Sequence, residues 1–386
     1  MTDPLIYNGN TVNLSRKTFC VKKLIYVILL VINSLAAVGL LFSYLSTLIS
    51  PEKIFWLPFF GLAYAVLLII NTLFAIFWAW RKQWIFLLSV ITIAIGYKQL
   101  SSVFAYNVTQ HDVISTHQPI KLLSYNVRLF DLYNWSKNTE TRDKIFNYII
   151  HQNADIICFQ EFFNDKTNQF TTLDSLIKFQ KAREVHAEYT TVNKGIHQFG
   201  IATFSKYPIV KKGTISFSGT NNITIYTDIK ILNDTIRVYN NHLQSNHFSP
   251  DDYQVINKIG YKESPKQLFR IGPILRKMSL AFEKRAFQVE QIGKHIAKSP
   301  YPVIVCGDFN DTPVSYSYRK MRGQLSDAFL GSGFGFGHTI ARSFPSFRID
   351  YIFHHNNIRS SNFQRDKVDF SDHYPIHCLL YLPYKL

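Results

Sequence analysis

The chain has 386 residues, of which 47% are hydrophobic and 15% aromatic, and its formal net charge is +16. This length exceeds one average domain, and the composition can supply both a soluble core and a membrane part. The four cysteines show no disulfide framework and no metal-ligand spacing. Cys158, Cys306 and Cys378 each lie in an apolar, strand-like run, where cysteine behaves as a small buried hydrophobic residue, and Cys20 precedes the first apolar span.

The positive charge is shared between two parts of the chain. Residues 1–104 hold eight Lys/Arg and two Asp/Glu, which leaves 34 against 24, a net charge of +10, for the remainder. A basic domain suits a polyanion or an anionic membrane surface. The surplus could equally reflect attraction of a membrane-proximal domain to lipid headgroups.

Three apolar spans stand near the N-terminus, at 24–49, 54–80 and 84–105. The first two carry no charge and exceed the roughly 20 residues that cross a bilayer, whereas Lys98 interrupts the third. We expect a tail at 1–23 followed by about three transmembrane helices. Buried core helices are the alternative. A cleaved signal peptide is not expected, because the first span is too long and no clear cleavage site follows it.

Basic residues predict the orientation of these spans, because loops rich in Lys and Arg stay in the cytoplasm. They precede the first span and lie between the second and the third, at Arg16, Lys17, Lys22, Lys23, Arg81 and Lys82. This pattern predicts a multi-pass protein of the inner or plasma membrane with a cytoplasmic N-terminus. The remainder of the chain then lies on the outer, periplasmic or extracellular face if the third span crosses, and in the cytoplasm if that span is re-entrant.

After a polar linker at 106–119, short apolar runs alternate with amphipathic segments. Runs bounded by turn residues predict strands, and apolar residues at helical spacing predict helices. The predicted helices are 141–152 and 281–298, and the predicted strands are 121–125, 155–159, 200–205, 224–231, 235–240, a strand from 303, 326–329, 348–353 and 377–381. This alternation predicts a mixed α/β domain whose sheets are covered by helices.

The most informative segment is 303–313, VIVCGDFNDTP, in which a buried-strand pattern ends in a polar cluster. Polar residues follow nearly every other predicted strand as well. Carboxylates and amides at several strand ends suit a hard cation such as Mg²⁺, and histidines can move protons near neutral pH. These residues are Asn126, Glu161, His242, Asp308, Asn310, Asp350, Asp372 and His373.

Six motifs in order, SYNVR, FQEF, NNHLQS, GDFNDTP, RIDYIF and SDHYP, span residues 120–386. At these motifs the chain resembles the endonuclease/exonuclease/phosphatase superfamily. The resemblance implies a DNase I-like four-layer α/β/β/α sandwich at 120–386 and metal-dependent hydrolysis of phosphoesters. The implied cofactor is Mg²⁺, which Mn²⁺ could replace, and no nucleotide cofactor is indicated.

The resemblance also implies the metal ligands. The Glu of the FQEF motif, Glu161, would bind Mg²⁺. Asn126 of the first motif would support the metal and the phosphate. Asp372 of the last motif would bind the metal directly or would position a residue that does.

The remaining roles implied by the resemblance concern the reaction itself. Asp308 and Asn310 would orient the attacking water and the phosphate oxygens. His373 would be the general base, held by Asp350, and a carboxylate behind a histidine does fix its tautomer and raise its basicity. His242 would contact the scissile phosphate or protonate the leaving oxygen.

Several simpler interpretations remain open. Asp308 could cap a turn, and His242 could be a structural histidine. Arg348 would bind phosphate or be an ordinary surface arginine. The basic and aromatic insertion at 245–280 would be a flap over the site or a solvated helical excursion.

Three functions remain in competition. The first is a membrane-anchored, Mg²⁺-dependent phosphodiesterase of nuclease type, with nucleic acid as substrate. The second is a phospholipid-headgroup hydrolase similar to sphingomyelinases, or a phosphatase, and the third is a non-catalytic membrane scaffold. The expected partners are therefore a phosphodiester substrate and the lipid bilayer, and no protein partner is indicated.

Overall fold

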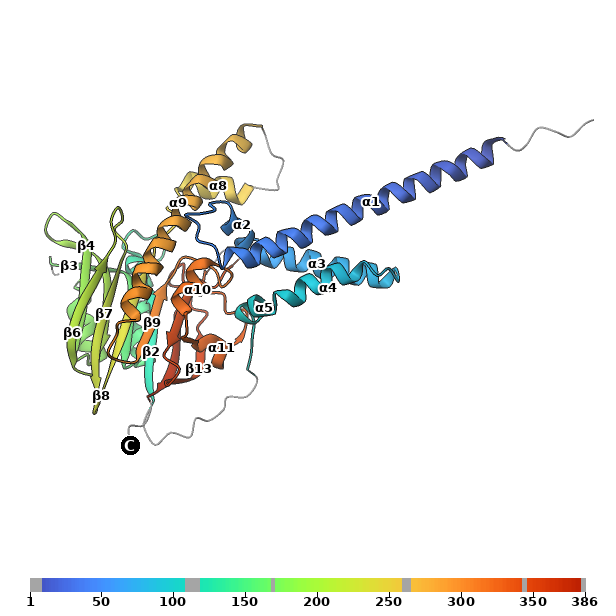
Figure 1. Ribbon diagram of the computed structural model, residues 1–386. Helices are drawn as coiled ribbons and strands as arrows, with labels where there is room; N and C mark the ends of the chain where they lie inside the picture. The colour runs from blue at the N-terminus through green and yellow to red at the C-terminus, as the bar shows by residue number, and fades with distance from the viewer. Residues whose placement is uncertain (1–8, 108–118, 168–170, 259–264, 342–345, 383–386) are drawn as a thin grey trace, which may run out of the picture.

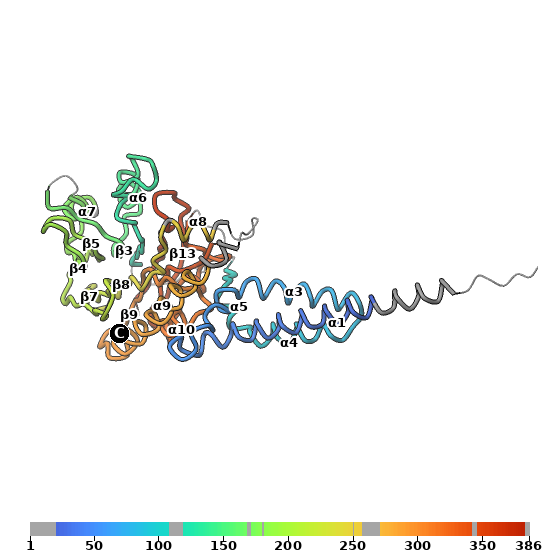
Figure 2. Tube along the Cα trace, turned by 90° about the horizontal axis from the view of Figure 1, so that it is seen from above, coloured from blue at the N-terminus to red at the C-terminus, as the bar shows by residue number. Residues whose placement is uncertain are grey.

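The computed structural model describes residues 9–107, 119–167, 171–258, 265–341 and 346–382. A bundle of helices near the N-terminus projects from an α/β body formed by the rest of the chain (Figure 1). Its long members, α1, α3 and α4, lie side by side along this projection in both views (Figure 2). The helices are α1 (Gly9–Ser46), α2 (Leu57–Leu62), α3 (Tyr64–Trp80), α4 (Phe86–Ile95) and α5 (Tyr97–Val103).

The prediction of about three transmembrane helices is wrong. One helix in the described part of the chain is long and apolar enough to cross a membrane, through its segment Val21–Ser46. The predicted span at 54–80 is interrupted at Ala63, and α3 has only 17 residues. The predicted span at 84–105 bends by 66° between α4 and α5. Neither the multi-pass topology nor its orientation is supported by these elements.

Packing explains the bend at Gly96, the residue between α4 and α5. A Cβ atom there would lie 2.1 Å from the ring of Tyr44, so the α1 side chain occupies the space beside the glycine. The Tyr44 hydroxyl also donates a hydrogen bond to the Thr92 carbonyl oxygen at 3.1 Å. Helix α1 therefore holds the bent pair against itself.

Two six-stranded sheets form the centre of the body. One has the order β10-β12-β9-β8-β7-β6 and the other β13-β14-β2-β3-β5-β4, while β1 and β11 pair separately. The strands are β1 (Ala105–Tyr106), β2 (Ile120–Asn126), β3 (Ile156–Asp165), β4 (Glu184–Asn193), β5 (His197–Ser205), β6 (Ile209–Ser216), β7 (Ile223–Ile231), β8 (Asp234–His242), β9 (Val303–Asp308), β10 (Ser326–Asp327), β11 (Phe334–Gly335), β12 (Asp350–His354), β13 (Arg359–Arg365) and β14 (Ile376–Tyr381).

Three apolar cores show that the sheets pack face to face with helices outside. The core between the sheets joins residues such as Leu122 and Cys158 to Val238 and Cys306. Helices α6 and α7 cover one outer face, and α9 and α10 cover the other. Their bounds, with those of the remaining helices, are α6 (Thr141–Gln152), α7 (Thr172–Gln180), α8 (Pro250–Lys258), α9 (Pro265–Ile296), α10 (Tyr316–Arg322) and α11 (Ala328–Ser332).

Most predicted elements are present, and the errors have local causes. The helix at 141–152 has the predicted bounds, whereas α9 begins well before the predicted 281. The strand predicted at 326–329 is wrong beyond Asp327. The Asp327 carboxylate accepts a hydrogen bond from the Phe329 N–H at 3.0 Å, and so caps α11. Residues 108–118 of the predicted linker and 1–8 of the predicted tail lie outside the described residues.

The helical bundle contacts the body close to two of the sequence motifs. Val314, which follows the GDFNDTP motif, packs with Leu40, Tyr44 and Tyr64 of the bundle. The ring of Phe59 in α2 also meets Phe282 of α9 edge to face, with centroids 5.4 Å apart. The bundle is therefore attached beside the strand end that carries Asp308.

Candidate active site

Three neighbouring strands of one sheet bring polar residues to the same edge. His242 ends β8 and lies opposite Asp308, which ends the parallel strand β9. Asp308 in turn lies opposite Asp350, which begins the antiparallel strand β12. The register of these strands places His242, Asp308 and Asp350 side by side, although more than 100 residues separate His242 from Asp350 in the sequence.

The second sheet contributes Asn126 and Glu161 to the same region. Glu161 stands in β3 where the pairing with β5 shifts register, and its φ of 48° is in the left-handed region. Such a bulge redirects a side chain. The Asn126 amide nitrogen donates to Glu161 Oε1 at 3.3 Å and to Asp308 Oδ2 at 3.1 Å. Asn126 therefore links the two sheets at the site.

Gly307, immediately before Asp308, is required by its surroundings. Its φ is +126°, and a Cβ atom would lie 2.1 Å from the carbonyl oxygen of Asn241 on β8. Only glycine combines this backbone conformation with such a close approach of two strands. The close approach fixes the position of Asp308 beside His242.

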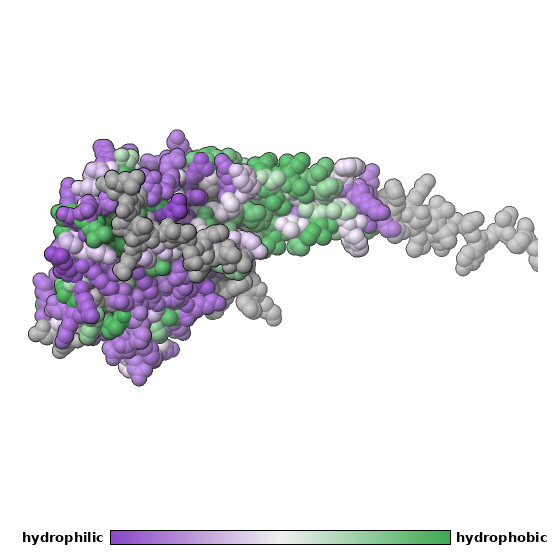
Figure 3. All heavy atoms as spheres, turned by 90° about the horizontal axis from the view of Figure 1, so that it is seen from below, coloured by the Kyte–Doolittle hydropathy of each residue, from purple (hydrophilic) through white to green (hydrophobic). Residues whose placement is uncertain are grey.

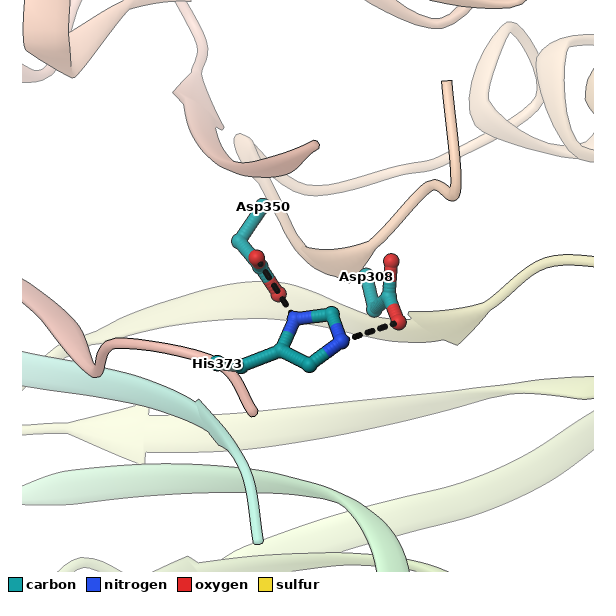
Figure 4. A group of neighbouring side chains, drawn as sticks. All are labelled: Asp308, Asp350 and His373. Carbon is teal, nitrogen blue, oxygen red and sulfur yellow. Dashed lines mark hydrogen bonds and ion pairs between the residues drawn. The ribbon is translucent and has the colours of Figure 1, made fainter. Parts of the chain in front are cut away.

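His373 lies between two carboxylates, as Figure 4 shows. Its Nδ1 is 2.9 Å from Asp350 Oδ2, and its Nε2 is 3.6 Å from Asp308 Oδ2. Burial by itself lowers the pKa of His373, but Asp350 and Asp308 outweigh it and hold that pKa well above its usual range. The two carboxylates therefore favour the protonated form of the His373 ring.

His242 has the opposite electrostatic character. Burial lowers its pKa, although the charge of Asp308 opposes the shift. The Nε2 atom of His242 is buried and has no hydrogen-bond partner among the described residues. It lies 3.8 Å from Glu161 Oε1 and 3.9 Å from Asp308 Oδ2. A neutral histidine with an unsatisfied nitrogen in a polar site is available to a substrate atom.

Asn310 supports Asp308 from the turn that follows β9. Its backbone N–H donates to Asp308 Oδ1 at 2.8 Å, and its side-chain amide donates to the Leu243 carbonyl oxygen at 3.0 Å. Its φ of 53° is in the left-handed region, which asparagine tolerates better than most residues. Burial raises the pKa of Asp308, and the charge of His373 opposes the rise.

The donor set around Glu161 fits a divalent cation. Burial and the nearby charge of Asp372 raise the pKa of Glu161 to about 7, while His373 opposes the rise. A buried carboxylate near a second carboxylate suits a divalent cation such as Mg²⁺ or Mn²⁺. Glu161 and Asp372 are the carboxylates predicted to hold it. A second group, Asp308, Asp350 and His373, has potential ligand atoms within 4.8 Å of one another.

One of the predicted roles does not match the observed contacts, and another stays a prediction. Asn126 Oδ1 accepts a hydrogen bond from the Arg128 N–H at 3.1 Å, while its amide nitrogen joins Glu161 to Asp308, so its support of the metal and the phosphate stays a prediction. Arg348 is only 2% exposed. It pairs with Asp327 at 2.8 Å and donates to the Ser102 carbonyl oxygen at 2.7 Å. Arg348 therefore joins the body to the end of α5, and its placement as a phosphate ligand or as a surface arginine is wrong.

Two residues at the site were missed in the sequence. Thr339 Oγ1 accepts hydrogen bonds from the N–H groups of Ile349 and Asp350, at 3.0 and 3.1 Å, and so positions the start of β12. Arg128 pairs with Asp372 at 3.3 Å. Arg128 is the last residue of the SYNVR motif, so the motif could have indicated that it belongs to the site. No feature of the local sequence distinguishes Thr339 from an ordinary threonine.

Comparison with known proteins agrees with this arrangement. Residues 123–373 match the Endonuclease/Exonuclease/phosphatase family, and residues 23–103 match a domain of unknown function (DUF8431). Among curated proteins, none matches the chain by sequence.

Solved structures are similar to the chain at low sequence identity. An endonuclease/exonuclease/phosphatase from Beutenbergia cavernae DSM 12333 is 13% identical with a TM-score of 0.51, over 69% of this chain and 72% of that chain. The catalytic domain of human Nocturnin with bound sulfate is 18% identical with a TM-score of 0.47, over 69% and 94%. Sphingomyelinase C from Streptomyces griseocarneus is 19% identical with a TM-score of 0.45, over 68% and 99%.

The likeness to the Beutenbergia structure shows that the body has the same fold, an α/β sandwich with two large sheets. The family match covers the first five motifs in full and the last one through His373, about two thirds of the chain. The predicted family and enzyme class are thereby confirmed. The chain belongs to the Endonuclease/Exonuclease/phosphatase family, whose members are metal-dependent phosphoester hydrolases.

Proposed function

We propose that this protein is a metal-dependent phosphodiesterase that acts by in-line attack of water on phosphorus. The observation that carries the proposal is the chain of contacts from Asp350 through His373 to Asp308. This chain faces the unsatisfied Nε2 of His242 and the Glu161 carboxylate across the sheet edge. A phosphodiester is already anionic, so its hydrolysis needs charge neutralisation and an oriented nucleophile more than covalent catalysis.

The residues divide the work as follows. Asp308 orients the attacking water and takes its proton, because burial makes this carboxylate more basic than usual. His373, protonated and held by Asp350, supplies positive charge beside the reacting oxygens. His242 contacts the phosphate or the leaving oxygen through Nε2 as the phosphorus–oxygen bond breaks, and the leaving oxygen takes its proton from solvent. A Mg²⁺ or Mn²⁺ ion held by Glu161 and Asp372 would supply further neutralisation of the phosphate charge.

This assignment revises the sequence-based role of His373. A general base must begin without its proton, whereas Asp350 and Asp308 keep the pKa of His373 well above its usual range. Asp308 is the better proton acceptor, and His373 is the better electrostatic partner for an anionic substrate. The revision leaves Asp350 as the residue that orients His373.

Nucleic acid is the substrate class we propose first, because the chain beyond residue 104 carries 34 Lys/Arg against 24 Asp/Glu. Such a surplus favours a polyanion. A phospholipid headgroup is the second candidate. Figure 3 shows hydrophobic residues over the bundle, between the α/β body and a hydrophilic far end, and such a surface would concentrate the enzyme at lipid.

We also propose that the bundle is anchored in a lipid bilayer through α1. Large apolar side chains such as Leu35, Val66 and Ile91 are exposed on α1, α3 and α4. Polar groups are turned inward instead: the Asn33 amide donates to Ser89 Oγ at 2.8 Å, and the indole N–H of Trp78 donates to Asn33 Oδ1 at 2.9 Å. This distribution is the reverse of a bundle in water and suits apolar surroundings.

The test is hydrolysis by the full-length protein in detergent micelles, with plasmid DNA, RNA and phospholipid vesicles offered in parallel. We expect nucleic-acid cleavage that requires Mg²⁺ or Mn²⁺, stops with chelator and is lost in Glu161→Gln and Asp308→Asn. His151→Ala, at an exposed histidine of α6, is the matched control and keeps full activity. Headgroup release without nucleic-acid cleavage would select the lipid enzyme, and no hydrolysis of any substrate would refute a phosphodiesterase.

A further inference from the structure

We infer that Arg128, Tyr133 and Trp135 form a subsite that stacks a nucleobase beside the scissile phosphate of a nucleic-acid substrate. We call these three residues the aromatic wall. The inference rests on the proposed function, because it names the substrate class that the same site would accept. It also explains side chains that the catalytic arrangement does not use.

The aromatic wall begins at the site and runs outward without a gap. Arg128 Nε lies 3.3 Å from Asp372 Oδ2, next to the catalytic His373 in sequence. The Arg128 guanidinium stands over the Trp135 ring at 4.6 Å from its centroid. Tyr133 then meets Trp135 edge to face, with centroids 5.0 Å apart and an interplanar angle of 66°. A ligand held at Asp372 would therefore have the aromatic wall as its next neighbour.

The two rings of the wall are open to solvent. Tyr133 is 60% exposed and Trp135 is 42% exposed, so neither ring serves to fill the core. A single exposed aromatic residue is ordinary on a protein surface. Two rings fixed against a guanidinium, and through it against an active-site carboxylate, form a built platform with faces available to a planar partner.

The loop that carries the wall is rigidly constructed. Arg128, Leu129, Phe130 and Asp131 have φ values of 45–57°, an unfavourable left-handed run for non-glycine residues. The surrounding structure holds it, because Phe130 is buried in the core. The Asp131 carboxylate accepts hydrogen bonds from both the backbone N–H and the hydroxyl of Ser136. Backbone in so unusual a conformation, held so firmly, is typical of a functional segment.

The chemistry of the wall favours a nucleobase over a lipid. Aromatic rings and guanidinium planes bind bases by stacking in many proteins that recognise single-stranded nucleic acid. An acyl chain would instead need an apolar slot, whereas this wall is joined to the site by the Arg128–Asp372 ion pair. The positive charge of the body adds attraction for the flanking phosphates.

The sequence offers a direct reporter of binding, because Trp135 is the only tryptophan after residue 84. The fluorescence of full-length wild type minus that of Trp135→Phe isolates its signal. The probes are a single-stranded oligonucleotide and an oligonucleotide of equal length made of abasic nucleotides, both with chelator present to prevent cleavage. We expect the oligonucleotide with bases to quench Trp135 and the abasic one to leave it unchanged.

Kinetics on the full-length protein in micelles provide the second test. Trp135→Ala and Tyr133→Ala should each raise KM for the oligonucleotide roughly tenfold, with kcat within about twofold of wild type. Neither variant should change KM for the abasic oligonucleotide. Tyr301→Ala is the matched control, because Tyr301 precedes β9 at the end opposite Asp308. Equal melting temperatures would show that all variants are folded.

The outcomes separate the two proposals. Equal quenching by both oligonucleotides, an unchanged KM in Trp135→Ala, or quenching by anionic phospholipid vesicles alone would overturn the base subsite. If DNA hydrolysis is intact in the same experiments, the proposed phosphodiesterase activity is still supported. Base-dependent quenching without hydrolysis of any nucleic acid would support the subsite and refute the proposed reaction.

Discussion

Replacement of Asp350 by asparagine tests the arrangement at its centre. Asp350 is 3% exposed, and its Oδ2 lies 2.9 Å from His373 Nδ1. The substitution keeps the size of the side chain but removes the negative charge that favours a protonated His373. At an effective dielectric constant of about 20, unit charges this close interact by about 6 kcal/mol, which is an upper bound for the loss.

Part of that interaction is regained by the amide, which still forms a hydrogen bond. We therefore expect kcat to fall about 10²–10⁴-fold in Asp350→Asn, the usual contribution of a positioned histidine, with a smaller change in KM. The assay is hydrolysis of single-stranded DNA by the full-length protein at saturating Mg²⁺. Thermal unfolding of the same samples separates a catalytic loss from a loss of structure.

Asp366→Asn is the matched control for this experiment. Asp366 also pairs with a histidine, His377, at 3.2 Å, but His377 belongs to β14, in the sheet that does not carry Asp350. It should lose stability and keep kcat. Activity near wild type in Asp350→Asn, or an equal loss of kcat in both variants, would refute the role given to the Asp350–His373 pair.

Three further predictions concern stability. In Gly307→Ala the new Cβ would lie 2.1 Å from the Asn241 carbonyl oxygen, which costs about 3 kcal/mol or more in strain. The melting temperature should therefore fall by about 6–12 °C. An unchanged melting temperature would contradict the described strand contact. Arg348→Met should lower the free energy of unfolding by about 3–5 kcal/mol, because it leaves the Asp327 carboxylate buried without a positive partner. Adding Asp327→Asn to that variant should restore part of this free energy, as measured by chemical denaturation. The pKa of Asp366 is lowered chiefly by the hydrogen bond with its histidine partner, so its stabilising effect is complete above about pH 4 and is lost as pH falls through the lowered pKa. The difference in melting temperature between wild type and Asp366→Asn should therefore be large at pH 7 and shrink as pH falls below about 4. A difference that grows in acid would contradict this reasoning.

The sequence alone was sufficient wherever the signal was local. The helix at 141–152 and the strand before Asp308 follow from short-range apolar patterns, and the structure contains both. The burial of Cys158, Cys306 and Cys378 was predicted from the apolar runs around them, and all three are buried free thiols. The family and the enzyme class followed from six motifs, because each carries chemically distinctive side chains in or beside a strand.

Only the tertiary structure decided how distant segments share space. The break of an apolar span at Gly96 depends on the ring of Tyr44 from another helix. The burial of Arg348 depends on Asp327 and on the Ser102 carbonyl oxygen. No local pattern encodes such partners, because the same composition is compatible with a straight span or a surface arginine.

The same distinction applies to the site. Its polar residues could be named from the motifs, but their protonation and orientation come from distances between strands. Asp308 and Asp350 raise the pKa of His373, and the amide of Asn126 joins Glu161 to Asp308. The sequence by itself determined which chemical groups are present, whereas the packing of two sheets decided which charges face each other, because electrostatic interaction depends on separation and burial.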